Sequence, residues 1–151
     1  MAEITTYQML VNGQWADASD GKRYDSIDPA SGVVWATMAE ATEEDVNRAV
    51  AAAVAAGSTG PWAQMTPTER GKCLRRLGDL LADASEQLGR VETRDTGKMF
   101  KETRWQATYI AEYFHFYAGA ADKIEGSTLP IDKPNMFVFT NREPLGVVAA
   151  I

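Results

Sequence analysis

The run Gly146-Val147-Val148-Ala149-Ala150-Ile151 decides the fold class, because it is apolar throughout and carries no polar alternation. Such a strand is covered on both faces, which is typical of parallel sheets in α/β proteins. It needs neighbouring strands on both sides and a crossover helix after it. The sequence therefore predicts an α/β protein in which this run is an unfinished strand, and a chain that is not a complete catalyst.

Composition excludes several classes of function. The chain has 151 residues, enough for one domain, and a net charge of -6 with acids and bases mixed, which argues against a nucleic-acid surface. The apolar stretch Ala49–Ala56 is too short to span a membrane, and the N-terminus lacks the pattern of a signal peptide. The single cysteine, Cys73, fits a reducing compartment. We expect a cytoplasmic protein that binds neither nucleic acid nor membrane.

Turn residues predict short antiparallel β-structure in residues 1–40. Asn12-Gly13 supplies the positive φ angles of a type I′ hairpin turn. Asp28–Gly32 is a second cluster of turn residues. The strands expected around these two turns are residues 9–11, 14–16, 24–27 and 33–39.

Helix signals follow. Thr42 and Asp45 resemble a capping box for a helix that Gly57 would end. Thr66, Pro67 and Glu69 mark the start of a second helical region. Its apolar period predicts a break near Ser85 and a stop at Gly97.

A third helix is expected over residues 100–123, followed by a β run at residues 136–140 that Pro144 interrupts. This helix is rich in aromatic residues, which favours a core or an inter-subunit seam over a ligand cage or a base-stacking surface, because no basic residues line it. The aromatic residues are Trp105, Tyr109, Tyr113, Phe114, Phe116 and Tyr117.

Three groups of side chains could carry chemistry, and we favour a structural role for each. Cys73 lies at an apolar position of a helix, which predicts a buried thiol rather than a nucleophile. His115 lies in an aromatic run without a partner nearby, which predicts a packed or surface-edge histidine rather than a general base. The carboxylates of Glu43–Asp45 are explained by the helix dipole. The sequence also lacks the glycine-rich, Cys-x-x-Cys and His-Glu-x-x-His motifs.

Several segments, taken in order, resemble the N-terminal region of the aldehyde dehydrogenase superfamily. They are Val11–Trp15, Ile27–Gly32, Ala39–Val46, Gly60–Ala63, Glu92–Lys98, Tyr117–Gly119 and Arg142–Val148. Asp28 stands where the family more usually has Asn before Pro-Ala, and both residues suit the turn. The order and spacing of the segments over nearly the whole chain make the resemblance specific.

The resemblance implies an NAD(P)-dependent enzyme that oxidises a small-molecule aldehyde to a carboxylic acid through a cysteine thioester. In this family the Gly-Val-Val run begins the nucleotide-binding sheet. The catalytic Cys, the general base Glu and most of the dinucleotide site follow later. We therefore expect an N-terminal fragment that has no catalytic or cofactor-binding residue and is inactive alone. NAD or NADP would serve the parent enzyme.

The family also implies how the chain is divided. Residues 1–124 would form the β-hairpin and helical flank of a Rossmann-like cofactor domain, and residues 145–151 the first strand of its truncated sheet. Residues 125–144 would form a β oligomerisation arm, because an unpaired strand edge favours pairing with another chain. A homo-oligomer, dimer or tetramer, is expected.

A structural K⁺ or Na⁺ ion is a further expectation from the family. The resemblance places it at Ser26, Ile27 and Asp95, where one carboxylate and neutral oxygens suit a weakly hydrated monovalent ion. The alternative is that Asp95 only caps the turn at Thr96-Gly97.

Two rival functions follow from the same residues. One is a natural short assembly module, without catalysis, that docks onto full-length subunits through Met136–Asn141. The other is a cation-binding structural domain.

Overall fold

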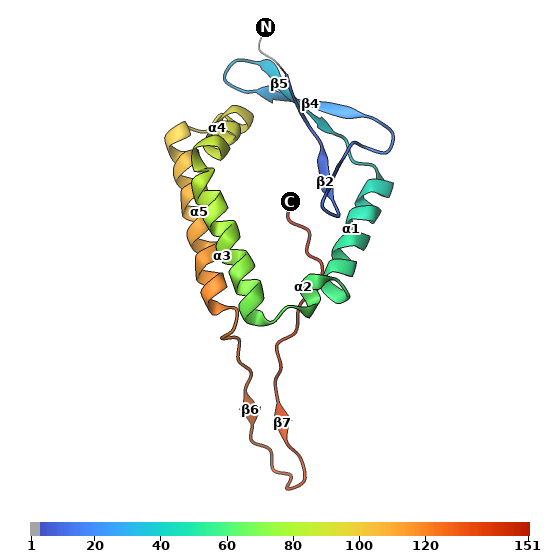
Figure 1. Cartoon of the computed structure of the whole chain (residues 1–151), viewed down its shortest axis with the longest axis vertical. Coiled ribbons are helices and arrows are strands. Elements are labelled where there is room, and N and C mark those ends of the chain that lie inside the picture. The colour runs from blue at the N-terminus through green and yellow to red at the C-terminus, as the bar shows by residue number, and fades with distance from the viewer. Residues whose placement is uncertain (1–3) are drawn as a thin grey trace.

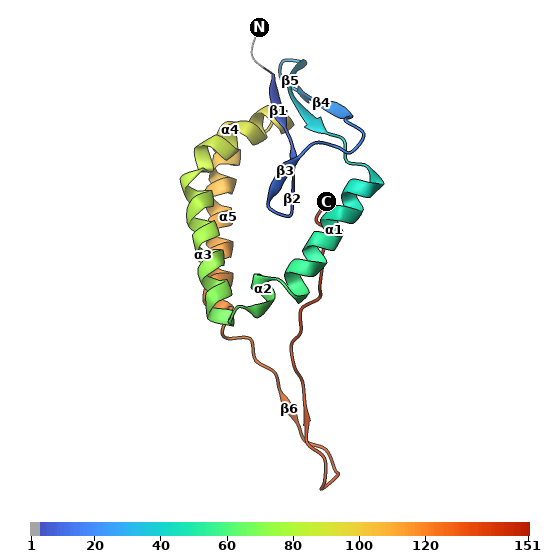
Figure 2. The same cartoon turned by 45° about the vertical axis from the view of Figure 1, so that its right-hand side comes forward.

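The computed structural model describes residues 4–151, in which helices and short strands build a mixed α/β fold (Figure 1). A small sheet lies at one end and a β-hairpin projects from the other. Between them, α1 (Glu43–Ser58) stands opposite a three-helix bundle, and α2 (Pro61–Gln64) joins the two sides (Figures 1 and 2). The buried apolar side chains are those of Ala18, Trp35, Ala36, Ala107 and Ala111.

Three strands form the sheet, in the order β1 (Thr5–Tyr7), β5 (Val33–Ala39) and β4 (Arg23–Asp28). β4 and β5 are antiparallel, as the turn between them predicts, whereas β1 runs parallel to β5. The expectation of purely antiparallel strands is therefore wrong at β1. This short segment becomes a strand because an edge of β5, distant in sequence, is available to pair with it.

The Asn12-Gly13 turn joins β2 (Met9–Val11) to β3 (Gln14–Ala16) in a separate two-stranded ribbon. Both turn residues have positive φ angles, 52° at Asn12 and 75° at Gly13. A type I′ turn requires this geometry, so the predicted hairpin is confirmed.

α1 begins at the predicted capping box, in which the Thr42 side chain and the Asp45 carboxylate each bind the other's backbone N–H. The helix passes through Gly57 and ends with Thr59 as its C-cap, so the predicted stop at Gly57 is wrong. Glycine lowers helix stability without forbidding the conformation, and the last turn continues past it.

The bundle consists of α3 (Pro67–Asp83), α4 (Ser85–Thr96) and α5 (Phe100–Ala120). The capping box at Thr66, the break beside Ser85 and the stop at Gly97 are confirmed. α5 ends before the predicted residue 123. In the part of the chain that the structure describes, no helix is long and apolar enough to cross a membrane.

Glycines lie where the helices of the bundle approach one another. Gly71 and Gly78 on α3 and Gly89 on α4 are buried against α5. A side chain at any of them would strike α5, so the missing Cβ atoms let the helices approach. Cys73 lies off this seam and is exposed, so the predicted buried thiol is wrong.

Beyond α5 the chain leaves the bundle as a projecting hairpin (Figure 1). Its strands, β6 (Thr128–Leu129) and β7 (Val138–Phe139), pair antiparallel, and β7 lies in the predicted β run. The run Gly146–Ile151 pairs with no strand of residues 4–151, so its assignment as the first strand of a nucleotide-binding sheet stays a prediction. An apolar strand forms only where neighbouring strands bind its backbone. The expected Rossmann-like sheet stays a prediction.

Candidate cation site

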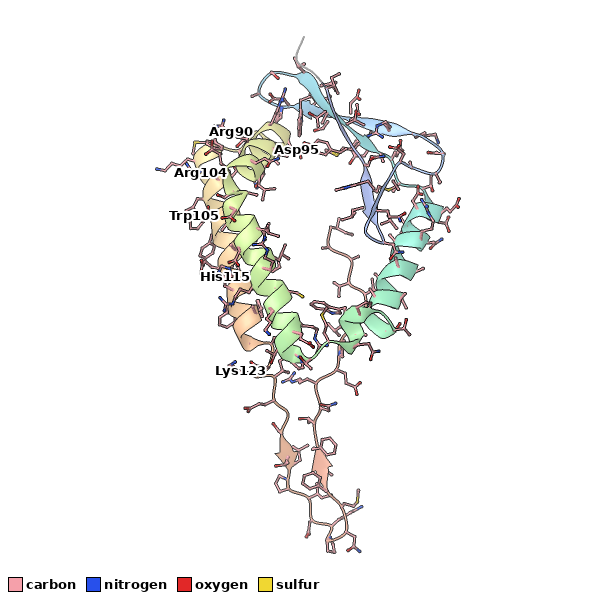
Figure 3. The ribbon with its side chains drawn as sticks, in the orientation of Figure 1. Arg90, Asp95, Arg104, Trp105, His115 and Lys123 are labelled. Carbon is pink, nitrogen blue, oxygen red and sulfur yellow. The ribbon has the colours of Figure 1, made fainter. Side chains whose placement is uncertain are left out.

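Ser26 and Asp95, predicted to share a site, are in direct contact. Ser26 is on β4 and Asp95 is in the last turn of α4, yet the Ser26 hydroxyl donates to Oδ1 of Asp95 over 2.5 Å. Figure 3 shows Asp95 at the end of α4 that lies beneath the sheet. The carboxylate therefore binds β4 rather than capping the turn at Thr96-Gly97.

The close approach of α4 to the sheet depends on the turn after β4. Gly97 has a φ of 76°, and an added Cβ there would lie 2.9 Å from Cγ of Pro29. The glycine therefore both ends α4 and lets the Asp28–Gly32 turn pack against it. Within that turn, the backbone N–H of Ala30 donates to the Asp28 carboxylate over 2.8 Å.

The pairing of β4 with β5 is irregular at the site, because β5 carries an extra residue there. The register of β4 against β5 shifts between Ser26 and Ile27, so Ser26 faces Ala36 while Ile27 faces Val34. Trp35 is the extra residue of this β-bulge. A bulge interrupts the hydrogen bonds of the ladder and can free backbone oxygens at that point. Ile27 follows Ser26 on β4, and its side chain is exposed.

Trp35 and Arg94 complete the cluster. The indole N–H of Trp35 donates to the Ser26 hydroxyl over 2.9 Å. The guanidinium of Arg94 lies over the Trp35 ring, 5.3 Å from its centroid. The backbone N–H of Ala30, Ser31 and the more distant Arg94 charge hold the pKa of Asp28 below its ordinary value.

This donor set fits a monovalent cation better than a divalent one. Ser26 uses Oδ1 of Asp95, and Oδ2 has no hydrogen-bond partner within residues 4–151. Calcium and magnesium draw more carboxylates, and the described residues contain no cluster of three or more His, Cys, Asp or Glu side chains that could hold a metal. One carboxylate and one hydroxyl suit K⁺ or Na⁺ better than a divalent ion.

The other candidate groups lie elsewhere. His115 is on α5, packed over Gly78 of α3, and its Nε2 lies 3.0 Å from Oδ1 of Asp79 (Figure 3). This is the packed histidine that the sequence predicts. Asp45 is buried at the start of α1, where it accepts the backbone N–H groups of Thr42 and Ser19. Its role is to join elements.

The aromatic residues of α5 are not in the core of the described chain. Trp105 and Tyr109 stack with ring centroids 4.9 Å apart, and Tyr113 meets Tyr109 edge-on. All three are exposed, because α5 packs on the bundle through the small buried side chains of Thr103, Ala107 and Ala111. The prediction of a core position is wrong for them, and the inter-subunit seam remains a prediction.

Comparison with known proteins gives the family. The family model described as "Aldehyde dehydrogenase family" matches residues 15–151. The chain belongs to the aldehyde dehydrogenase family. The candidate cation site lies within the matched residues, as do the bundle and the projecting hairpin.

Two similar relatives are much longer than this chain. A (Z)-2-((N-methylformamido)methylene)-5-hydroxybutyrolactone dehydrogenase of Acinetobacter baylyi is 48% identical, over 96% of this chain and 29% of its own length. Aldehyde dehydrogenase family 2 member C4 of Arabidopsis thaliana is 41% identical over 100% of this chain and 30% of its own. The chain thus spans less than a third of these relatives.

Solved structures of aldehyde dehydrogenases share the fold of this chain. An NAD⁺ complex of the aldehyde dehydrogenase from Bacillus cereus superposes with a TM-score of 0.88 and 35% identity, covering 93% of this chain and 28% of that one. A putative aldehyde dehydrogenase from Burkholderia cenocepacia gives a TM-score of 0.86 and 42% identity, covering 91% of this chain and 28% of that one. The described fold is therefore that of one segment of an aldehyde dehydrogenase.

Sequence reasoning missed Trp35 and Arg94. Trp35 stands in an apolar strand, where an aromatic residue reads as core, and the bulge that turns its N–H to Ser26 leaves no pattern in the sequence. Arg94 directly precedes Asp95, and this adjacency is the one signal that could have pointed to it.

Proposed function

We propose that this chain is the N-terminal part of an NAD(P)-dependent aldehyde dehydrogenase, which oxidises an aldehyde to a carboxylic acid through a cysteine thioester. The observation that carries the proposal is the family match over residues 15–151, together with a fold that superposes on solved members over most of the chain. In that chemistry NAD or NADP accepts the hydride. The NAD⁺ complex of the Bacillus cereus relative supports NAD as the cofactor of the whole enzyme.

The proposed role of this segment is support rather than catalysis. Cys73 is exposed on α3, and His115 is engaged by Asp79 on the α3–α5 seam. Neither arrangement provides the nucleophile and base pair that thioester chemistry needs. An exposed free thiol also supports the proposal of a reducing, cytoplasmic setting.

The proposed structural element for assembly is the arm, residues 125–144. Its hairpin projects from the bundle, and the apolar side chains of Met136, Phe137 and Phe139 are exposed on it. Exposed apolar strands of this kind are suited to pairing with another subunit. We propose that the arm pairs subunits of a homo-oligomer, a dimer or a tetramer.

The proposed cation at Ser26, Ile27 and Asp95 has a structural purpose. It would neutralise the Asp95 carboxylate where α4 meets β4 and so hold the bundle against the sheet. K⁺ or Na⁺ would be the bound ion.

A second candidate function is favoured by the exposed arm alone: a non-catalytic assembly module that docks onto full-length subunits. Size-exclusion chromatography of this chain with the full-length Acinetobacter relative tests it. Co-elution that is lost after Phe139→Asp supports the module, and separate elution removes it.

A chimera tests the leading proposal. This chain would replace the matching N-terminal segment of the Acinetobacter relative, and NADH formation would be followed by absorbance with the relative's own substrate. We expect an active chimera and no activity from the 151-residue chain alone. A folded chimera without activity would contradict the proposal that this segment supports the reaction. Activity from the chain alone would contradict its non-catalytic role.

A further inference from the structure

Trp35, Ser26 and Asp95 form a directed chain of hydrogen bonds. The indole nitrogen of Trp35 can only donate, and it donates to the Ser26 hydroxyl over 2.9 Å. The Ser26 hydroxyl has one proton, and it donates that proton to Oδ1 of Asp95 over 2.5 Å. Each bond in such a chain strengthens the next.

This chain of bonds determines where the Asp95 carboxylate lies. Asp95 is largely exposed, and an exposed carboxylate is free to turn toward water unless a partner holds it. Ser26 holds Oδ1, and because the Ser26 oxygen accepts from Trp35, its proton is left to donate to Asp95.

The Trp35 ring is itself fixed on both sides. It is buried in the sheet, and Tyr7 meets it edge-on with centroids 6.0 Å apart. Arg94 covers it through a cation–π contact. A rigid ring gives its N–H a fixed direction, which is what a positioning group requires.

We propose that Trp35 is a positioning residue of the cation site: through Ser26 it pre-organises the Asp95 carboxylate to bind K⁺ or Na⁺. The inference rests on the proposed cation site and adds a residue that does not touch the ion. Pre-organised ligands bind more tightly because less freedom is lost on binding. Loss of the neutral hydrogen bond from Trp35 to Ser26 should therefore weaken cation binding about three- to tenfold.

The test measures the melting temperature of the 151-residue chain during titration with KCl or NaCl. Tetramethylammonium chloride keeps the ionic strength constant, because that ion is too large for the site. Trp35→Phe removes the N–H and keeps a ring for Arg94, whereas Asp95→Asn removes the charged ligand. Trp62→Phe is the matched control, because Trp62 lies on α2, which packs on α1.

The outcomes separate the two proposals. We expect the wild type and Trp62→Phe to share one half-saturation concentration, Trp35→Phe to require about three- to tenfold more salt, and Asp95→Asn to lose the response. A wild type without a K⁺ or Na⁺ response, or an Asp95→Asn variant that keeps it, overturns both proposals. An unchanged midpoint in Trp35→Phe, with the response lost in Asp95→Asn, overturns only the role of Trp35.

A readout on the wild type covers the case in which Trp35→Phe does not fold. The indole N–H of Trp35, assigned by triple-resonance NMR, should shift during the KCl titration with the same midpoint as the melting temperature. The indole N–H of Trp62 serves as the internal control. A Trp35 signal that stays fixed while the protein binds the cation overturns the inference.

Discussion

Asp45, at the start of α1, accepts a hydrogen bond from the backbone N–H of Ser19 over 3.0 Å, and Ser19 lies in the segment between β3 and β4. The same carboxylate accepts the backbone N–H of Thr42 over 2.9 Å and pairs with Arg48. Asp45 is only 1% exposed. One buried side chain therefore caps α1 and ties it to the β-structure.

The first prediction is a loss of stability in acid that depends on Asp45. The N–H donors of Thr42 and Ser19 hold the pKa of Asp45 well below its ordinary value. Because the folded-state pKa is the lower one, the carboxylate stabilises the fold above about pH 4, the pKa of an unfolded Asp, and this contribution is lost as the pH falls further. Asp45→Asn should lower the melting temperature by several degrees at pH 7.

The comparison with Asp45→Asn isolates that effect. The difference in melting temperature between wild type and variant should be full at pH 7 and should shrink from about pH 4 downward. Asp17→Asn is a control, because Asp17 forms an exposed pair with Arg23. A difference in melting temperature between wild type and Asp45→Asn that is constant from pH 7 to pH 3 would contradict a lowered pKa of Asp45 in the folded state.

The second prediction concerns the glycine seam. A Cβ added at Gly89 would lie 2.8 Å from both the backbone nitrogen and the Cα of Arg104 on α5. Backbone atoms cannot move aside as a side chain can, so α4 and α5 must separate. Gly89→Ala should lower the free energy of unfolding by about 1–3 kcal/mol, measured by urea denaturation.

Gly119 provides the matched control for the seam. It lies within α5, and an added Cβ there would meet nothing within 4 Å. Gly119→Ala should therefore raise the free energy of unfolding by about 0.5–1 kcal/mol through helix propensity alone. Equal effects of the two substitutions would show that the seam is not closely packed.

The third prediction is energetic coupling between Gly78 and His115. An alanine Cβ at Gly78 would lie 2.6 Å from Cδ2 of His115, so the ring must turn away and lose its contact with Asp79. Gly78→Ala should lower the free energy of unfolding by about 1–3 kcal/mol in the wild type. The loss should be smaller in the His115→Ala background, where the ring is absent. A double-mutant cycle should give a coupling of at least about 0.5 kcal/mol, and strict additivity would contradict the packing.

Features set by local physics could be predicted from the sequence. The Asn12-Gly13 turn and the capping box at Thr66 depend on residues within four positions of one another, and both form as expected. The family resemblance, not a local pattern, predicted that Ser26 and Asp95 share a site. They lie 69 residues apart and are in contact.

Features set by distant partners could not be predicted. β1 is a strand because β5 is beside it. Cys73 shares the apolar spacing of α3, but the glycines decide which side of that helix meets α5. Gly146–Ile151 has the composition of a buried strand, and composition cannot supply the neighbouring strands that its backbone requires.

The last prediction tests the contact that brings α4 to the sheet. Gly97 combines a positive φ of 76° with a close approach to Pro29, whereas Gly32 has a φ of 69° and open space. Gly32→Ala should cost about 1 kcal/mol for the left-handed backbone alone. Gly97→Ala should lower the free energy of unfolding by the same backbone term and by about 1–3 kcal/mol in addition, because its Cβ pushes Pro29 away.

The extra cost of Gly97→Ala should be accompanied by a change at Asp95, since displacement of the turn moves β4 away from α4. In an NMR comparison, the indole N–H of Trp35 should shift in Gly97→Ala and stay fixed in Gly32→Ala. If both variants lose the same free energy of unfolding, the Gly97–Pro29 contact does not hold the bundle against the sheet. The Ser26–Asp95 hydrogen bond would then have to hold this junction without help from the turn.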